Sequence, residues 1–190
     1  MSLTKNDINI LNELAKQYMS LATLPIQKEK IELWKSLNRC KMQRPMVVID
    51  QLPWSEINFD GSLTCLIQDS FWRGVENNLR TAIFKWLNFP SDMVLDAFIT
   101  IPKVISNSGY GLKVSEETLH SDINNEIVSH SYKNQIKTEE DIYKIQDIKI
   151  SYDEKLTSEM LQQANIIFAG IAPVVLSGGL TLHLGIWDHL

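Results

Sequence analysis

The chain has 190 residues, a formal net charge of −5 at pH 7, 44% hydrophobic and 22% charged residues. This length and composition are typical of one globular domain with a sizeable core, not of a disordered chain. Lys and Arg form no basic stripe, and neither a signal-peptide pattern nor an apolar run of ~18 residues occurs, so we expect a cytoplasmic protein without nucleic acid or membrane as partner.

The first part of the chain predicts two amphipathic helices. Apolar side chains recur at three- and four-residue spacing across residues 7–19, which places them on one helical face. Pro25 suits the first position of a second helix, which continues until the basic stretch 39–44. We therefore expect a helical extension over residues 1–44.

Three short apolar runs, at residues 45–53, 93–102 and 173–178, predict strands that are buried on both faces. One amphipathic helical pattern precedes the second apolar run, and another precedes the third. Buried strands that alternate with such helices indicate an α/β fold with a parallel sheet, in which right-handed crossovers place the helices over the sheet. This alternation fits a closed barrel and a doubly wound open sheet equally well.

Two helices are predicted between these strands. The first begins at Asp69 or Ser70, whose side chains are good helix caps. The second begins at Ser151 or Asp153 and ends at Gly170.

An excursion interrupts this alternation at residues 107–137, where short alternating runs and turn residues indicate a hairpin. Thr138 then resembles the first residue of a capping box that opens a short helix.

Three blocks of the sequence resemble the uroporphyrinogen decarboxylase superfamily. Residues 44–51 stand where that family carries an Arg-Gln-Ala-Gly-Arg motif after its first strand. Residues 92–102 resemble its second-strand segment, and residues 173–179 are similar to its third strand and the glycine turn that follows.

Two further stretches, residues 44–54 and 150–154, are similar to uncharacterised decarboxylase-like proteins of anaerobic bacteria. That superfamily also includes corrinoid-dependent methyltransferases. The resemblance extends from about residue 31 onward and implies a single domain. In that domain, residues 45–190 supply barrel strands one to three, interrupted by the excursion at 107–137.

The resemblance implies the amino-terminal part of a (β/α)8 TIM barrel: amino-terminal helices and roughly the first three βα units. A complete barrel has eight strands and typically ~250 residues. We therefore expect an incomplete barrel that is inactive alone, from a truncated gene product, a split protein or a piece of a longer chain.

Departures from the decarboxylase motif decide between the activities that the resemblance implies. Only Gln51 matches the motif, because Asp50 replaces its first arginine and Trp54 its second. Uroporphyrinogen carries eight carboxylates, which guanidinium groups attract and Asp50 would repel. Corrinoid-linked methyl transfer is therefore favoured over a uroporphyrinogen decarboxylase-type carboxy-lyase.

The methyltransferases of this superfamily hold a zinc ion that activates a thiol, with His and Cys ligands in the second half of the barrel. We therefore expect no cofactor on this chain, and zinc in the absent half if the parent is a methyltransferase. The implied partners are a small-molecule substrate and a corrinoid protein, a complementing barrel half or a second copy. The rival hypothesis is a non-catalytic α/β binding module or split-protein subunit that uses an open sheet edge.

Chemistry in these barrels takes place at the carboxyl ends of the strands. Five residues are therefore candidates for substrate binding, while no catalytic residue is predicted. Asp96 lies inside the second apolar run, where an unpaired charge is costly, so a structural ion pair is its alternative role. The full set is Asp50, Gln51 and Trp54 after the first strand, Asp96 in the second, and His183 after the third.

The cysteines and histidines do not predict a metal site. Cys40 and Cys65 have no CxxC spacing, and a reducing compartment would keep both as buried thiols. An extended chain at ~3.3 Å per residue would separate His183 from His189 by roughly 20 Å, too far to share one ion.

Overall fold

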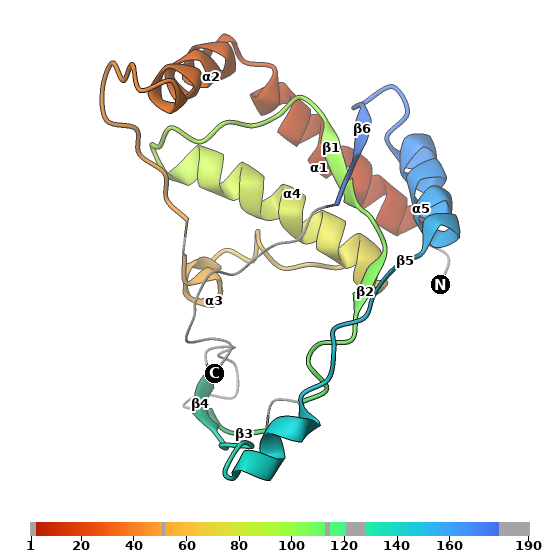
Figure 1. The fold of residues 1–190 in the computed structure, drawn as a ribbon. Helices are drawn as coiled ribbons and strands as arrows, with labels where there is room; N and C mark the ends of the chain where they lie inside the picture. Colours follow the sequence, from red (N-terminus) through yellow and green to blue (C-terminus); the bar gives the residue numbers. More distant parts are fainter. Residues whose placement is uncertain (1–2, 51, 113–114, 121–127, 179–190) are drawn as a thin grey trace.

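Three long helices pack around one pair of parallel strands (Figure 1). The computed structural model describes residues 3–50, 52–112, 115–120 and 128–178. The helices are α1 (Lys5–Ala22), α4 (Ser70–Asn88) and α5 (Glu154–Ile167), and the strands are β1 (Ile99–Pro102) and β6 (Val174–Ser177). A shorter helix, α2 (Pro25–Asn38), follows α1, and α3 (Trp54–Ile57) is a single turn before α4.

Side-chain caps fix where the long helices begin. Thr4 forms a capping box with Asp7, in which the Asp7 amide donates to Thr4 Oγ1 at 3.2 Å. Asp69 accepts hydrogen bonds from the first amides of α4, and Asp153 accepts from the Leu156 amide in α5 at 2.8 Å. The predicted starts of α4 and α5 are thereby confirmed, with Asp69 and Asp153 as the capping residues. The first helix begins at Lys5, two residues before the predicted range of 7–19.

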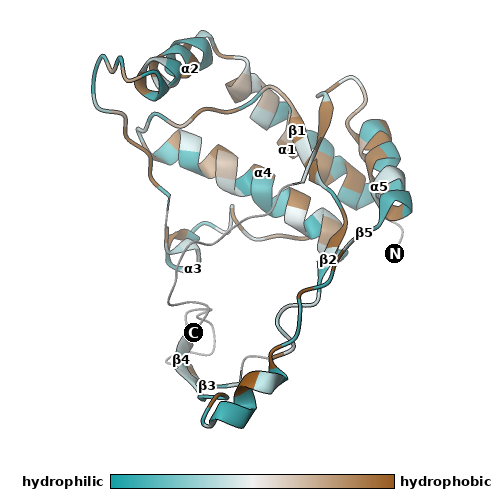
Figure 2. Ribbon diagram, in the orientation of Figure 1, coloured by the Kyte–Doolittle hydropathy of each residue, from teal (hydrophilic) through white to brown (hydrophobic). Residues whose placement is uncertain are grey.

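The core lies where α1, α4 and α5 meet the two parallel strands. Each of these elements contributes apolar side chains at the spacing that its periodicity requires. β6 is predominantly hydrophobic and α2 predominantly hydrophilic in Figure 2. The residues at the centre of this core include Leu11, Ala15, Trp72, Val75, Leu79, Ile101, Ala164 and Phe168.

Strands β1 and β6 are joined through α5 into a parallel unit. Ile99 pairs with Val174 and Pro102 with Ser177, and the Lys103 amide donates to the Ser177 carbonyl at 2.8 Å. α5 packs against both strands. The protein is therefore a mixed α/β fold, and the third predicted strand is present as β6. Burial on both faces was wrong, because every second residue of β1 and of β6 is exposed. Within the described ranges, the β1–β6 sheet has two strands and does not close into a barrel.

The connection between β1 and α5, which contains the excursion, extends away from the helices (Figure 1). β3 (Glu116–His120) and β4 (Val128–Tyr132) form the predicted antiparallel hairpin, and the 3-10 helix η1 (Glu139–Lys144) follows it with the expected cap at Thr138. β2 (Ile105–Asn107) pairs antiparallel with β5 (Ile150–Tyr152), and neither strand was predicted from the sequence.

The first predicted strand, residues 45–53, is wrong. Its described residues belong to no sheet, and Val47 and Val48 are each 53% exposed. The backbone N–H and C=O groups of Val47 both form hydrogen bonds with one residue, Asp92, and not with a neighbouring strand. Its amide donates to Asp92 Oδ2 at 2.8 Å, and its carbonyl accepts from the Asp92 amide at 2.7 Å.

Two smaller expectations also fail. The second predicted strand shortens to β1, so Asp96 lies before the strand, where it is exposed and needs no buried partner. Cys40 is exposed and not buried, because it follows α2 with a positive φ of 57° at the end of the helix. Cys65 is half-buried.

None of the helices in the described part of the chain is both long enough and apolar enough to cross a lipid bilayer.

Arg44 holds the Asp92 carboxylate that fixes the extended segment. Its guanidinium donates twice, at 2.8 and 2.6 Å, and this pairing is the main reason that the pKa of Asp92 lies well below its usual range. Lys30 and Trp34 of α2 donate to the neighbouring carbonyls of Ser91 and Asp92, each at 2.7 Å. Ionised Asp92 therefore ties residues 44–47 to the segment before β1, and the backbone carbonyls of that segment attach α2 to it.

This pairing predicts a pH dependence of stability. A carboxylate with a depressed folded pKa contributes stability above its unfolded pKa of about 3.9 and loses that contribution as the pH falls toward the folded value. We expect Asp92→Asn to lower the Tm at pH 7 and to flatten the fall in Tm below about pH 4, as measured by circular dichroism. Asp141, whose pKa is also lowered, chiefly by Lys144, remains in both proteins. Parallel pH curves for the two proteins would contradict the prediction.

Candidate functional site

A polar cleft of about 540 Å³ lies between α3 and α4, and its lining includes Trp54, one of the predicted site residues. Sites for small ligands typically measure roughly 300–1,000 Å³. Its walls are α3, the segment at residues 58–65 and one face of α4. The lining residues that matter chemically are Trp54, Asn58, Cys65, Arg73, Gly74 and Asn77.

The helical repeat of α4 directs its polar residues into this cleft. Lining residues of α4 recur at three- and four-residue intervals, as Ser70, Arg73, Gly74, Asn77 and Thr81, so they share one face. The opposite stripe is buried in the core. The same periodicity that builds the core therefore supplies the cleft with a cation, an amide and two hydroxyls.

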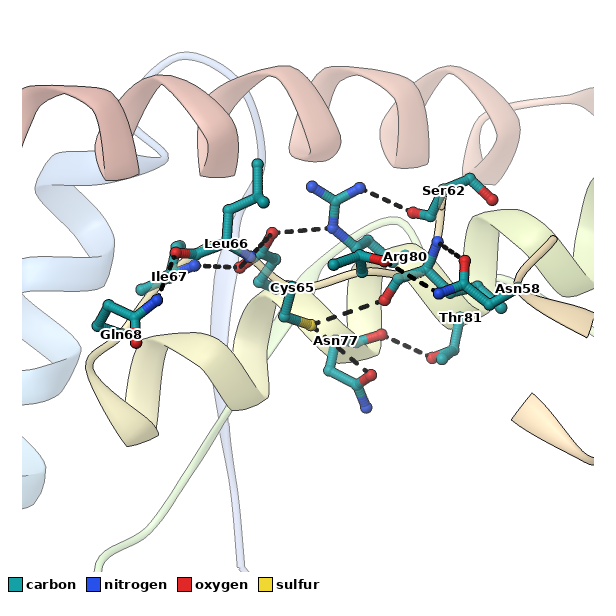
Figure 3. Close-up of polar contacts among 12 residues, drawn as sticks. Asn58, Ser62, Cys65, Leu66, Ile67, Gln68, Asn77, Arg80 and Thr81 are labelled. Atoms are coloured by element: carbon teal, nitrogen blue, oxygen red, sulfur yellow. Dashed lines mark hydrogen bonds and ion pairs between the residues drawn. The ribbon is translucent and has the colours of Figure 1, made fainter. Parts of the chain in front are cut away.

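The segment across the cleft is held by Asn58 (Figure 3). Its side-chain nitrogen donates to Thr64 Oγ1 and its oxygen accepts from the Leu63 amide, both at 3.0 Å. Asp60 closes the turn by accepting from the Ser62 amide at 2.9 Å. These local bonds give the wall facing α4 a defined shape.

A buried carboxylate joins that segment to α4. Glu76 is 0% exposed and accepts hydrogen bonds from the amides of Leu66 and Ile67, at 3.0 and 2.9 Å. Arg80, one turn later, donates to Glu76 from Nε at 2.8 Å and from Nη1 to the Ser62 carbonyl at 2.8 Å. Every oxygen of the buried charge is thus satisfied, which removes most of the cost of burying it.

Glu76 and Arg80 were not predicted as site residues from the sequence. A signal was present, because Glu76 stands between Val75 and Leu79 on the buried stripe and has Arg80 four residues later. A charge at a core position with an opposite charge one helical turn away indicates a buried ion pair.

Cys65 lies in the wall of the cleft with its sulfur 3.9 Å from Asn77 Oδ1. Burial raises the pKa of the Cys65 thiol, and the negative charge of Glu76 raises it further, while Arg80 and Arg73 partly offset both effects. The thiol therefore stays protonated at neutral pH. Since the thiolate is the reactive form, this cysteine is not arranged as a nucleophile.

The structure separates the residues predicted to bind substrate. Trp54 begins α3, is half-buried and lines the cleft. Asp50 is exposed on the extended segment before it. Asp96 is exposed beside Tyr18, where burial and then the Asp96 charge raise the pKa of the tyrosine. Gln51 and His183 lie outside the described residues.

The carboxyl ends of β1 and β6 form a second polar location. Lys103 follows β1 and packs against Gly178, where a Cβ would approach Lys103 Cδ to 2.5 Å. Its ammonium lies 5.9 Å from the centre of the Tyr152 ring. Gly178 therefore gives the Lys103 side chain room at the end of the sheet.

A metal site does not fit the described part of the chain, which contains no group of three or more His, Cys, Asp or Glu side chains placed to hold an ion.

Comparison of the chain with protein-family models, with curated proteins and with solved structures finds no match.

Loss of Arg80 should be strongly destabilising, because it leaves Glu76 buried without its cation. We expect Arg80→Ala to lower the free energy of unfolding by about 3 kcal/mol in urea denaturation. Lys35→Ala, which removes an exposed pair with Glu32, is the control and should cost under about 1 kcal/mol. A loss for Arg80→Ala as small as that of the control would show that Glu76 needs no cation.

Gly74 is costly in the middle of α4, and packing does not require it, since a Cβ there would meet nothing within 4 Å. We expect Gly74→Ala to raise the free energy of unfolding by about 0.5–1 kcal/mol, because alanine favours helix and restricts the unfolded chain. Thermal and urea denaturation of the two proteins would measure this. An unchanged or lower stability would mean that the cleft cannot accept a methyl group there.

Proposed function

We propose that the chain is the amino-terminal part of a uroporphyrinogen decarboxylase-like enzyme whose complete form carries out corrinoid-linked methyl transfer. In this proposal the fold is an incomplete (β/α)8 barrel. The supporting observation is the β1–α5–β6 unit, in which two parallel strands are joined through a helix packed on both. Such units are the repeating element from which (β/α)8 barrels are built.

The substrate site of the complete enzyme would form at the carboxyl ends of its parallel strands. Two such ends are together here, where Lys103 follows β1 next to Ser177 and Gly178 of the β6 end. The proposal assigns Asp50 and Trp54, on the segment before α4, to the wall of the same substrate site. Two strands do not enclose a cavity, so we expect the 190-residue chain to be inactive by itself.

Methyl transfer is preferred over carboxy-lyase activity because of charge. The exposed carboxylate of Asp50 replaces the first arginine of the motif that the decarboxylases carry, which is unfavourable for a substrate with eight carboxylates. Zinc, which would activate the acceptor thiol, is assigned to a part of the enzyme other than the described residues, because these contain no fitting ligand cluster.

One observation favours a second candidate, a non-catalytic binding module or subunit of a split protein. Among the described residues, β1 and β6 pair only with one another, so each has one strand edge free for another chain. A complementing barrel half or a second copy would pair there.

The proposal is tested on the protein isolated from its own cells through an amino-terminal tag, beside the purified 190-residue chain. Intact mass, zinc content and methyl transfer from methylcobalamin to a thiol are measured for both, with uroporphyrinogen decarboxylation as the competing assay. We expect zinc and methyl transfer in the native protein or complex, and neither in the 190-residue chain. Decarboxylation without methyl transfer would overturn the assignment, as would a native protein that shows neither activity. Stoichiometric zinc on the 190-residue chain would overturn the division of roles.

A further inference from the structure

We propose that the cleft between α3 and α4 binds a small planar aromatic carboxylate, with the carboxylate on Arg73 and the ring against Trp54. This inference does not depend on methyl transfer or on a barrel. It rests on the charge of the cleft, on its aromatic wall and on an unfilled position in the helix that forms its floor.

One formal charge lines the cleft, and it is a cation. Arg73 is exposed to the cavity and is the only residue with a formal charge among the described residues that line it. Glu76 lies behind the wall, where Arg80 and two amides satisfy it. A guanidinium recognises a carboxylate through two parallel hydrogen bonds.

The start of α4 does not supply this anion site. Asp69 Oδ1 already accepts from the amides of Phe71 and Trp72, at 3.1 and 3.2 Å. The side chains on the cleft face of α4 therefore determine binding. The oxygen of the Asn77 amide faces the Cys65 sulfur at 3.9 Å, which leaves the NH₂ group of that amide as a donor for the second carboxylate oxygen.

The aromatic wall is Trp54, whose indole is half-buried at the cleft. Indole faces pair with other aromatic rings in stacked or edge-to-face geometry, and these contacts add to ordinary apolar burial. A flat aromatic acid satisfies the indole and the guanidinium together, whereas an inorganic anion contacts the guanidinium alone.

Gly74 forms the floor between Arg73 and Asn77. A glycine in a helix interior lowers stability, and a Cβ at this position would meet nothing within 4 Å. Packing therefore gives no reason for glycine here. Because glycine has no side chain, the cleft stays open at this position, where a flat ring would lie.

The test is an NMR titration of the full 190-residue chain with benzoate, benzamide and cyclohexanecarboxylate. The reporter is the Trp54 indole N–H signal, assigned by its loss in Trp54→Phe. We expect benzoate to shift this signal saturably, with an affinity at least about tenfold higher than that of neutral benzamide. Cyclohexanecarboxylate should bind at least about threefold more weakly than benzoate, because it lacks an aromatic face.

Matched variants identify the groups responsible. Arg73→Gln should weaken benzoate binding at least about tenfold. Lys85→Gln is the control: it removes the same charge from α4 outside the cleft and should leave benzoate affinity unchanged. Gly74→Leu should weaken binding to a similar extent by filling the floor. Circular dichroism of each variant confirms that the helices are retained.

Three results would each overturn the proposal: benzamide binding as tightly as benzoate, Arg73→Gln binding like Lys85→Gln, or no saturable shift of the Trp54 signal. Equal affinity for cyclohexanecarboxylate would overturn the aromatic assignment. Because the chain is tested without zinc or a corrinoid, failure here leaves the proposed enzyme function standing, and failure of methyl transfer leaves this site standing.

Discussion

The burial of one face of α4 is the constraint on which the rest of the structure depends. Trp72, Val75 and Leu79 pack against α1 and the strands, and the helical repeat then fixes the opposite face as polar. Glu76, on the buried face, is the only residue of α4 that is both charged and buried. Through it, the segment that forms the far wall of the cleft is attached to the same helix that forms the near wall.

Carboxylates replace sheet pairing at two places in this protein. Glu76 accepts hydrogen bonds from the amides of Leu66 and Ile67. The Asp92 carboxylate accepts one from the Val47 amide and is paired with the Arg44 guanidinium. Extended segments are stabilised in this way without a neighbouring strand. This arrangement explains why residues 45–53 read as a strand by composition and yet stay on the surface.

The helices and their caps were predictable from sequence because their signals are local. The spacing of apolar residues in α1 and α4, Pro25 in α2 and Asp153 before α5 act within one or two turns. The predictions for residues 45–53, Asp96 and Cys40 failed because burial depends on partners distant in sequence. By residue type Val47 is expected in the core, but its amide donates to Asp92, 45 positions away, a partner that the local sequence does not indicate.

For the candidate site, Trp54 was found by its position relative to a family motif, whereas Arg73, Gly74 and Asn77 were not. Their spacing is visible in the sequence, but a polar helical face is by default a solvated one. Only the placement of α3 and residues 58–65 opposite that face turns it into the side of a cleft. Gly74 within the helix was the one sequence signal that pointed there.

The order in which β1 and β6 occur along the chain affects how the protein is made. β1 gains its only described partner after the excursion, η1 and α5 have all been synthesised. Until then the apolar segment at residues 99–102 has no strand to pair with in the nascent polypeptide, while α1 and α4 are already able to pack together. Closure of the parallel pair joins segments far apart in sequence, which slows folding. Translation therefore passes through a stage in which this strand is exposed to association with other chains.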